Sequence, residues 1–271
     1  MSENTKRIIS AVWLTAIIAA AGITGSYILL IMCAALSVLA EKEFFIALSL
    51  NDSFLRYASY AMCVIYYIAV FICGHEAAAF FAVLSFTIYM IITVFTFPDR
   101  SIKESFLYFA GLIYTCCLMS FLYLCREKGG IALYALVFIC SWLGDTFAYS
   151  VGRRFGKHKM VPRLSPHKSI EGFIAGLAGC TVTGALFGVL FKKSFSTIEA
   201  PVLACALSGF FGQLLSVAGD LTASAIKREC GIKDYSNLIP GHGGVLDRFD
   251  SVLFAAPFVY SIFTIMEKIF L

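Results

Sequence analysis

A polar stretch near the C-terminus holds the residue types that bind phosphate and metal. It reads SAIKRECGIKDYSNLIPGHGGVLDRFDS over residues 224–251. Arg holds phosphate oxygens bidentately and Lys holds them as a compact charge, while glycines let backbone amides approach an anion. The basic residues are Lys227, Arg228, Lys233 and Arg248, the glycines Gly241, Gly243 and Gly244, and the carboxylates Asp234, Asp247 and Asp250. Mg²⁺ prefers one or two carboxylates plus substrate phosphates, so the stretch predicts such a site. The alternative is a solvated loop that contacts anionic lipid headgroups. Such a loop would explain the basic residues but not the GHGG and DRFD segments.

Two further carboxylates fall inside apolar segments. Asp145 lies in SWLGDTFAY and Asp220 in SVAGDLTASAIKR. An ionisable residue within lipid is unfavourable, so each is a functional candidate. At about 100° per residue, one helical stripe of about 80° contains Ser216, Asp220, Ser224 and Lys227. A hydrogen-bonded helix-packing face is the alternative interpretation.

The elements that must position these residues are membrane helices. Of 271 residues, 60% are hydrophobic and only 14% are charged, which excludes a soluble domain. About 20 apolar residues span a bilayer. The apolar runs predict an all-α, polytopic membrane bundle of nine spans at 8–22, 24–40, 54–73, 77–97, 105–125, 130–150, 171–191, 199–225 and 250–270. We expect one integrated membrane domain, with N-terminal helices in 1–125 and the chemical motifs in 126–271. The segment 41–53 is expected to be a short amphipathic interfacial helix.

Basic residues predict the orientation, because cytoplasmic loops near span ends are enriched in Lys and Arg. With the N-terminus inside, only Arg126, Lys128, Lys192, Lys193 and Lys268 of the 21 basic residues face outward. Residues such as Lys6 and Arg7 lie inside. The two longest polar connections, 151–170 and 226–249, therefore face the cytoplasm.

The 224–251 stretch resembles the signature of the phosphatidate cytidylyltransferases, also called CDP-diacylglycerol synthases. The matching residues are Ser224, Lys227, Arg228, Lys233, Asp234, His242, Gly243, Gly244, Asp247, Arg248 and Asp250. A second block resembles the family upstream, with Asp145, Tyr149, Gly152, Arg153, Gly156, Lys157, Ser165, Pro166, Lys168, Glu171 and Gly172 in place. This block departs at His167, where a lysine is expected, and at Ile170, where a tryptophan is expected. The resemblance covers residues 140–251 strongly.

The resemblance implies transfer of CMP from CTP to phosphatidate, giving CDP-diacylglycerol and pyrophosphate in membrane phospholipid synthesis. It implies a two-cation centre with Asp220 and Asp247 as metal ligands, one cation being Mg²⁺ and the second open to a monovalent ion. Phosphate binding would involve Lys227, Arg228, Lys233, His242 and Arg248. Substrate contacts would be completed by Ser165, Lys168, Ser224, Gly243, Gly244, Asp145 and Asp250. The expected location is the cell membrane, the inner membrane in a bacterium, with the site facing the cytoplasm.

Two other functions stay open at this point. A CTP-dependent lipid-alcohol kinase would share the nucleotide and the membrane but attack the γ-phosphorus. An ion-coupled transporter would use intramembrane Asp residues for ions or protons, and it predicts paired repeats with broken helices. The partners expected are CTP and phosphatidate, without nucleic acid, and a homodimer is left open.

Overall fold

The computed structural model describes the backbone of residues 3–269 and the side chains of residues 9–269. The side chains of Lys6 and Arg7, and residue 270 of the last predicted span, lie outside this range. Within it the regular secondary structure is helical apart from one two-stranded hairpin and an isolated bridge between Ile239 and Gly243. The chain divides into two compact units. Unit 1 comprises residues 1–124 and 232–248, and unit 2 comprises residues 125–231 and 249–271.

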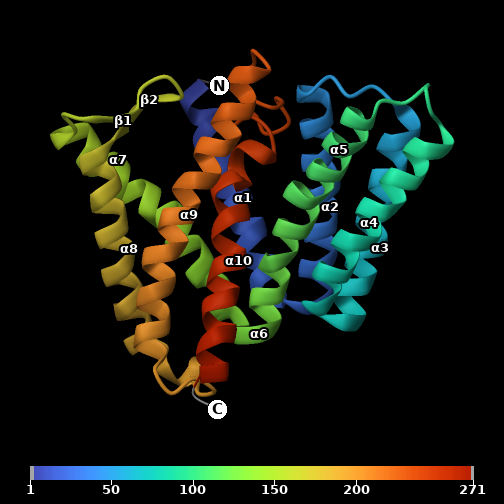
Figure 1. The fold of residues 1–271 in the computed structure, drawn as a ribbon. Helices are drawn as coiled ribbons and strands as arrows, with labels where there is room; N and C mark the ends of the chain where they lie inside the picture. Colours follow the sequence, from blue (N-terminus) through green and yellow to red (C-terminus); the bar gives the residue numbers. More distant parts are fainter. Residues whose placement is uncertain (1–2, 270–271) are drawn as a thin grey trace. The chain divides into compact units, whose positions relative to one another are not determined.

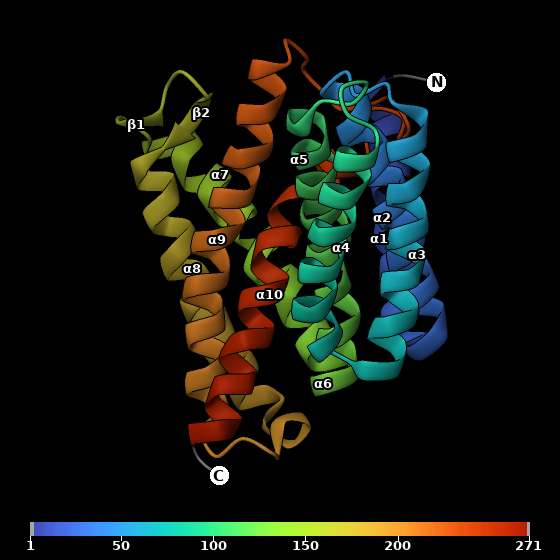
Figure 2. The ribbon, with the colours of Figure 1, turned by 45° about the vertical axis from the view of Figure 1, so that its right-hand side comes forward.

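Unit 1 is built from the first helices of the chain. They are α1 (Glu3–Thr24), α2 (Ser26–Ala47), α3 (Ser53–Cys73), α4 (Glu76–Phe95) and α5 (Ile102–Gly111), followed by a π-helical turn (Leu112–Cys117) and the start of α6 (Leu118–Phe138). The α2–α3 and α3–α4 pairs are antiparallel neighbours, and α5 packs beside α4 (Figures 1 and 2). The Asp52 side chain caps α3 by accepting the Leu55 N–H at 2.9 Å. Buried hydroxyl pairs such as Tyr66–Ser120, at 2.8 Å, hold neighbouring helices together.

The expectation of a separate interfacial helix at 41–53 is wrong. Residues 41–47 continue α2, and the chain turns only at residues 48–52. Phe44 and Phe45 are buried, and so are the charged residues Glu41 and Glu43. The alternation of charged and apolar residues suggested a solvated face, but tertiary packing covers both carboxylates.

Unit 2 holds the later helices. They are the rest of α6, a π-helical turn (Ile139–Leu143), α7 (Gly144–Phe155), α8 (Ile170–Leu190), a 3₁₀ turn (Lys192–Phe195), α9 (Pro201–Glu229) and α10 (Leu246–Ile269) from Phe249 onward. Strands β1 (Lys159–Val161) and β2 (Ser165–Ser169) form an antiparallel hairpin between α7 and α8. Ser169 ends the hairpin and caps α8 by accepting the Gly172 N–H at 3.2 Å.

A stripe of small residues lets α8 pack closely against both α7 and α9 (Figure 1). The stripe repeats every fourth residue and is buried throughout, at Gly172, Gly176, Cys180, Gly184 and Gly188. A Cβ at Gly188 would lie 2.8 Å from the Val202 Cα, and one at Gly176 would lie 3.2 Å from the Gly144 carbonyl oxygen. Small residues at such spacing are typical of close helix contacts in membranes. The stripe fixes α7 and α9, which carry Asp145 and Asp220.

Six helices of the described chain are long and apolar enough to cross a membrane: Ser53–Cys73, Glu76–Phe95, Ile102–Phe155, Ile170–Leu190, Pro201–Glu229 and Leu246–Ile269. This confirms the prediction of a helical integral membrane protein. Ile102–Phe155 contains two of the predicted spans, because its helices follow without a gap. Its backbone leaves helical geometry at Gly129 and Gly130, at the boundary predicted between them. Ile9–Thr24 is a shorter apolar helix.

Candidate active site

In unit 1, Asp247 organises the loop before α10, here called the glycine loop (residues 232–245). Its Oδ2 atom accepts the backbone N–H groups of Tyr235 at 2.8 Å and Gly244 at 2.9 Å. The Asp247 residue is only 7% exposed. Gly243 has a φ of 78°, and a Cβ there would lie 2.7 Å from Asp247 Oδ2. The loop therefore needs glycine at position 243 both for its backbone angle and for space.

A second carboxylate, from α2, holds the other side of the same loop. Glu43 Oε1 accepts the Val245 N–H at 3.0 Å and the Ser236 hydroxyl at 2.6 Å. Its Oε2 accepts the Leu246 N–H at 2.8 Å. The Val245 and Leu246 amides lie at the start of α10, where backbone N–H groups lack partners within the helix.

Two predicted phosphate-binding residues lie beside these carboxylates in unit 1. His242 Nδ1 is 2.8 Å from the Ser10 Oγ of α1, and the same hydroxyl donates to the Pro240 carbonyl at 2.9 Å. Arg248 is partly buried, and its Nε atom has no hydrogen-bond partner among the described residues. A buried guanidinium nitrogen without a partner has a strong tendency to bind an anion.

In unit 2, three carboxylates from three helices lie near one another, with Asp220 interacting with the other two. Asp145 on α7 and Asp250 on α10 each lie close enough to Asp220 on α9 for their charges to interact. Gly219 allows this approach, because its Cα faces the Asp250 carbonyl with no room for a side chain. Asp250 is 6% exposed, and its Oδ1 accepts the Ser251 N–H at 2.7 Å. Asp145 and Asp220 both lie in helical segments that are long and apolar enough to cross a membrane.

Cations balance part of this charge. Lys168, at the end of β2, places its Nζ 2.5 Å from Asp220 Oδ2. Lys227, two turns after Asp220 on α9, interacts electrostatically with Asp250. The hairpin that carries Lys168 is held by Glu171, whose Oε1 lies 2.6 Å from His158 Nδ1. Three carboxylates facing two ammonium groups leave an excess of negative charge, which favours a bound cation.

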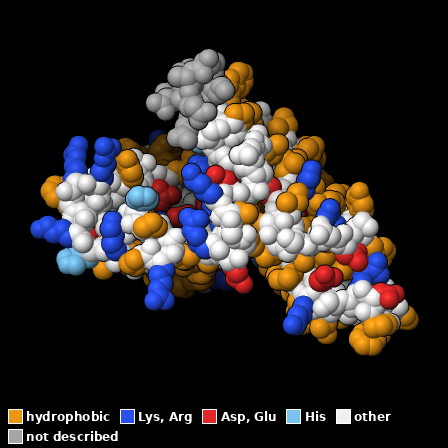
Figure 3. All heavy atoms as spheres, turned by 90° about the horizontal axis from the view of Figure 1, so that it is seen from above, with side chains coloured by type: hydrophobic (Ala, Val, Ile, Leu, Met, Phe, Trp, Pro, Cys, Tyr) orange, Lys and Arg blue, Asp and Glu red, His pale blue; other side chains and the backbone are white. Residues whose placement is uncertain are grey.

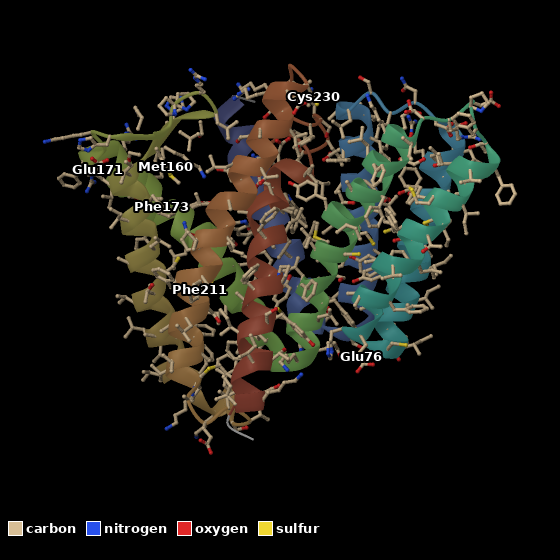
Figure 4. The ribbon with its side chains drawn as sticks, viewed as in Figure 1. Glu76, Met160, Glu171, Phe173, Phe211 and Cys230 are labelled. Atoms are coloured by element: carbon tan, nitrogen blue, oxygen red, sulfur yellow. The ribbon has the colours of Figure 1, made fainter. Side chains whose placement is uncertain are left out.

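The end of unit 2 that carries the hairpin is basic. Figure 4 shows Met160, Glu171 and Cys230 at this end, with Phe211 farther down α9. Figure 3 views this end and shows Lys and Arg side chains over the hairpin region. The exposed ones there are Arg153, Arg154, Lys157, Lys159 and Arg163. The C-terminal end of α9, with Lys227 and the exposed Arg228, therefore lies at the same end of unit 2 as the hairpin.

The remaining predicted residues lie on the same elements. Ser165 in β2 and Ser224 in α9 are partly exposed, and Lys233 in the glycine loop is exposed. The structure thus forms two groups. Asp247, Gly243, Gly244 and His242 belong to unit 1, whereas Asp145, Lys168, Asp220, Lys227 and Asp250 belong to unit 2.

A divalent cation fits these residues by charge and donor type. Within the described residues, no three His, Cys, Asp or Glu side chains are arranged to hold a metal by themselves. Mg²⁺ commonly binds through one or two carboxylates and completes its shell with water and substrate phosphates. Asp220 suits that role, since its side chain is 31% exposed and its neighbours are carboxylates.

The sequence reasoning missed Glu43 and Ser10. Neither belongs to the signature, and both contact the glycine loop from helices roughly two hundred residues earlier in the chain. A charged residue directly before Phe44 and Phe45 was the available signal at Glu43. For Ser10 the sequence offers no signal.

Residues 5–266 match the model of a protein family described as the cytidylyltransferase family. A phosphatidate cytidylyltransferase of Aquifex aeolicus is 40% identical over 161 residues, covering 59% of this chain and 56% of that protein. One from Bacillus subtilis is 36% identical over 183 residues, covering 67% and 65%. One from Haemophilus influenzae is 45% identical over 129 residues, covering 48% and 44%. The matched segments thus span about half to two thirds of these relatives' lengths.

Proposed function

Because this chain belongs to the cytidylyltransferase family, we propose that it transfers CMP from CTP to phosphatidate, giving CDP-diacylglycerol and pyrophosphate. The relatives named above are phosphatidate cytidylyltransferases. The observation that carries the proposal is the complete signature from Ser224 to Asp250, with its Asp247 carboxylate anchored by two backbone amides.

In this reaction an oxygen of the lipid phosphate attacks the α-phosphorus of CTP. A new P–O bond forms as the bond to the β-phosphate breaks, and pyrophosphate leaves with the electron pair. A phosphate monoester carries about −1.5 to −2 charges at pH 7, so no general base is required. Rate enhancement then depends mainly on positioning and charge neutralisation.

The basic residues supply that neutralisation. We assign Lys227, Arg228, Lys233, His242 and Arg248 to phosphate oxygens of CTP or of the lipid. Lys168 and Ser165 bind from the hairpin, and Ser224 and the amides around Gly243 and Gly244 complete the contacts. Asp145 and Asp250 orient these side chains or support the metal. For Lys168, its ion pair with Asp220 supports a position from which it can turn to a phosphate.

We assign the metal to Asp220 and Asp247, with Mg²⁺ as one cation and a second cation open to a monovalent ion. The anchored Asp247 carboxylate and the carboxylate-rich surroundings of Asp220 support this assignment. Bound there, Mg²⁺ would neutralise charge on the phosphates during the transfer.

We also propose nine spans with the N-terminus and both basic segments in the cytoplasm. The asymmetry of basic residues supports this orientation, as does the position of the hairpin and the end of α9 at one end of unit 2 (Figure 4). His158→Cys and Asn237→Cys, in a background without reactive native thiols, should be labelled only from the cytoplasmic side. Labelling from the outer face alone would reject the orientation.

The reaction itself is tested with the purified protein in neutral detergent micelles containing phosphatidate. With α-labelled CTP the label should enter the lipid, and one pyrophosphate should be released for each labelled lipid. With γ-labelled CTP the label should leave in pyrophosphate. Transfer of the γ-label to lipid would instead indicate a kinase, and no reaction with phosphatidate would reject the proposal.

A further inference from the structure

Glu43 connects a helix of the N-terminal region to the glycine loop. Its residue is 5% exposed, and its two oxygens accept three hydrogen bonds from Ser236, Val245 and Leu246, at 2.6, 3.0 and 2.8 Å. All of these residues belong to unit 1. A buried carboxylate with this many donors is held in one orientation, since leaving any donor unpaired would be unfavourable.

Glu43 and Asp247 fix neighbouring peptides of the same turn. Gly244 donates its N–H to Asp247 Oδ2, and a Cβ on Gly244 would lie 2.5 Å from each oxygen of Glu43. The next two amides, of Val245 and Leu246, point to Glu43. Removing the hydrogen bonds of Glu43 should therefore make the turn that orients Asp247 more mobile.

We infer that Glu43 is a positioning residue for the transfer reaction: it fixes the first turn of α10 and thereby the Asp247 carboxylate and the Arg248 guanidinium that follow it. This inference rests on the proposed function. Glu43 lies far from the signature in sequence, and its role comes from its place behind the loop. A negative charge at the first turn of a helix is also favourable toward the helix dipole.

Glu43→Gln is the informative change. A glutamine keeps one acceptor oxygen but presents an NH₂ group where the second oxygen was. At least one donor of the loop then faces another donor. Losing one charge-assisted hydrogen bond at this position should lower kcat about ten- to a hundredfold.

The chain offers a closely matched control in Glu41. It lies on the same helix two residues earlier and is fully buried, but its Oε1 accepts from Ser59 rather than from the loop. Burial raises the pKa of Glu41 to about 8, so its carboxyl is largely protonated at neutral pH and Gln resembles it. Glu41→Gln should keep kcat within about twofold of the wild-type value.

The experiment compares both variants as full-length protein in detergent, by kcat, by KM for CTP and by hydrogen exchange of the loop amides. For Glu43→Gln we expect a lower kcat together with faster exchange at Val245 and Leu246, while exchange in α3 stays unchanged. Glu43→Asp keeps the charge but shortens the side chain, and it should recover part of the kcat.

The outcomes separate this role from the proposed function. A wild-type protein without cytidylyl transfer would reject the function. An active wild type with equal kcat in Glu43→Gln and Glu41→Gln would overturn the positioning role, whatever the exchange rates. Should Glu43→Gln fail to fold, Glu43→Asp decides, because wild-type kcat in that folded variant would also overturn it.

Discussion

Asp247 in unit 1 and Asp220 in unit 2 are both assigned to the metal, but the protein surrounds them differently. Asp247 is anchored by two neutral backbone amides and lies almost out of solvent. Asp220 is paired with the Lys168 ammonium, is partly exposed and lies among other carboxylates. Two backbone amides therefore hold Asp247, whereas an ion pair holds Asp220.

The difference suggests two roles for carboxylates in one reaction. Two amide donors fix the direction of the Asp247 carboxylate, so a cation can bind there without a change in its orientation. An ion pair can exchange partners, because a bound cation can replace Lys168 beside Asp220 while the ammonium turns to a substrate phosphate. We infer that Asp247 is the rigid ligand and Asp220 the exchangeable one.

The largest expected effect comes from Asp247→Asn and Asp220→Asn, since a neutral amide is a much poorer Mg²⁺ ligand than a carboxylate. Each change should lower turnover about a thousandfold or more. The fold should survive in both. In Asp247→Asn one oxygen can still accept both loop amides, and Asp220→Asn relieves repulsion with Asp145 and Asp250.

Turnover should be measured over a range of Mg²⁺ concentrations, with thermal unfolding in detergent as the check of folding. A stabilising shift on Mg²⁺ addition should be present in the wild type and smaller in both variants. Near-normal turnover in either variant at any Mg²⁺ concentration would remove that residue from the metal centre.

Much of unit 2 could be predicted from the sequence, because its functional residues lie in long apolar segments. Helical period alone placed Ser216, Asp220 and Lys227 on one stripe, and α9 carries them as a single helix. The glycine loop was recognised by its residue types. Its anchoring was not, because Glu43 and Ser10 reach it through tertiary contacts that no local pattern encodes. The same limit explains the wrong prediction for segment 41–53. Its charged residues suggested a solvated helix face, but both of its glutamates are buried near the end of α2.

The next largest effect is expected at Arg248, the residue after Asp247, and it tests whether Arg248 binds phosphate. Arg248→Lys keeps the charge but loses the planar pair of donors, and its buried Nε has no partner within the described chain. We expect kcat/KM for CTP or for phosphatidate to fall roughly ten- to a hundredfold, or about 1.5 to 3 kcal/mol. Arg154→Lys, on the exposed end of α7, is the control and should change neither value. Unchanged constants for Arg248→Lys would make Arg248 a surface charge.

A smaller effect tests the exchangeable pair. Lys168→Met leaves Asp220 without its ion-pair partner and should lower the free energy of unfolding by about 1 to 2 kcal/mol, since the pair is only partly buried. Adding Asp220→Asn should recover most of that loss, because the uncompensated charge is gone. Both variants should be inactive. Chemical unfolding in detergent measures the free energy of unfolding of the wild type, both single variants and the double variant. If the losses of the two single variants add up strictly in the double variant, the two side chains are not coupled.

The smallest effect is expected at Ser10, which holds His242 from α1. The Ser10 Oγ lies 2.8 Å from His242 Nδ1, and the Ser10 hydroxyl donates to the Pro240 carbonyl at 2.9 Å. That contact orients the imidazole ring of a residue that we assign to phosphate.

Ser10→Ala removes two neutral hydrogen bonds at a partly exposed position, and each contributes about 0.5 to 1.5 kcal/mol. We expect kcat/KM for CTP to fall about two- to tenfold, because His242 loses the contact that orients its ring. Ser10→Thr retains the hydroxyl and should restore the wild-type value. A Ser10→Ala protein with wild-type kcat/KM for CTP would show that α1 does not set the orientation of His242.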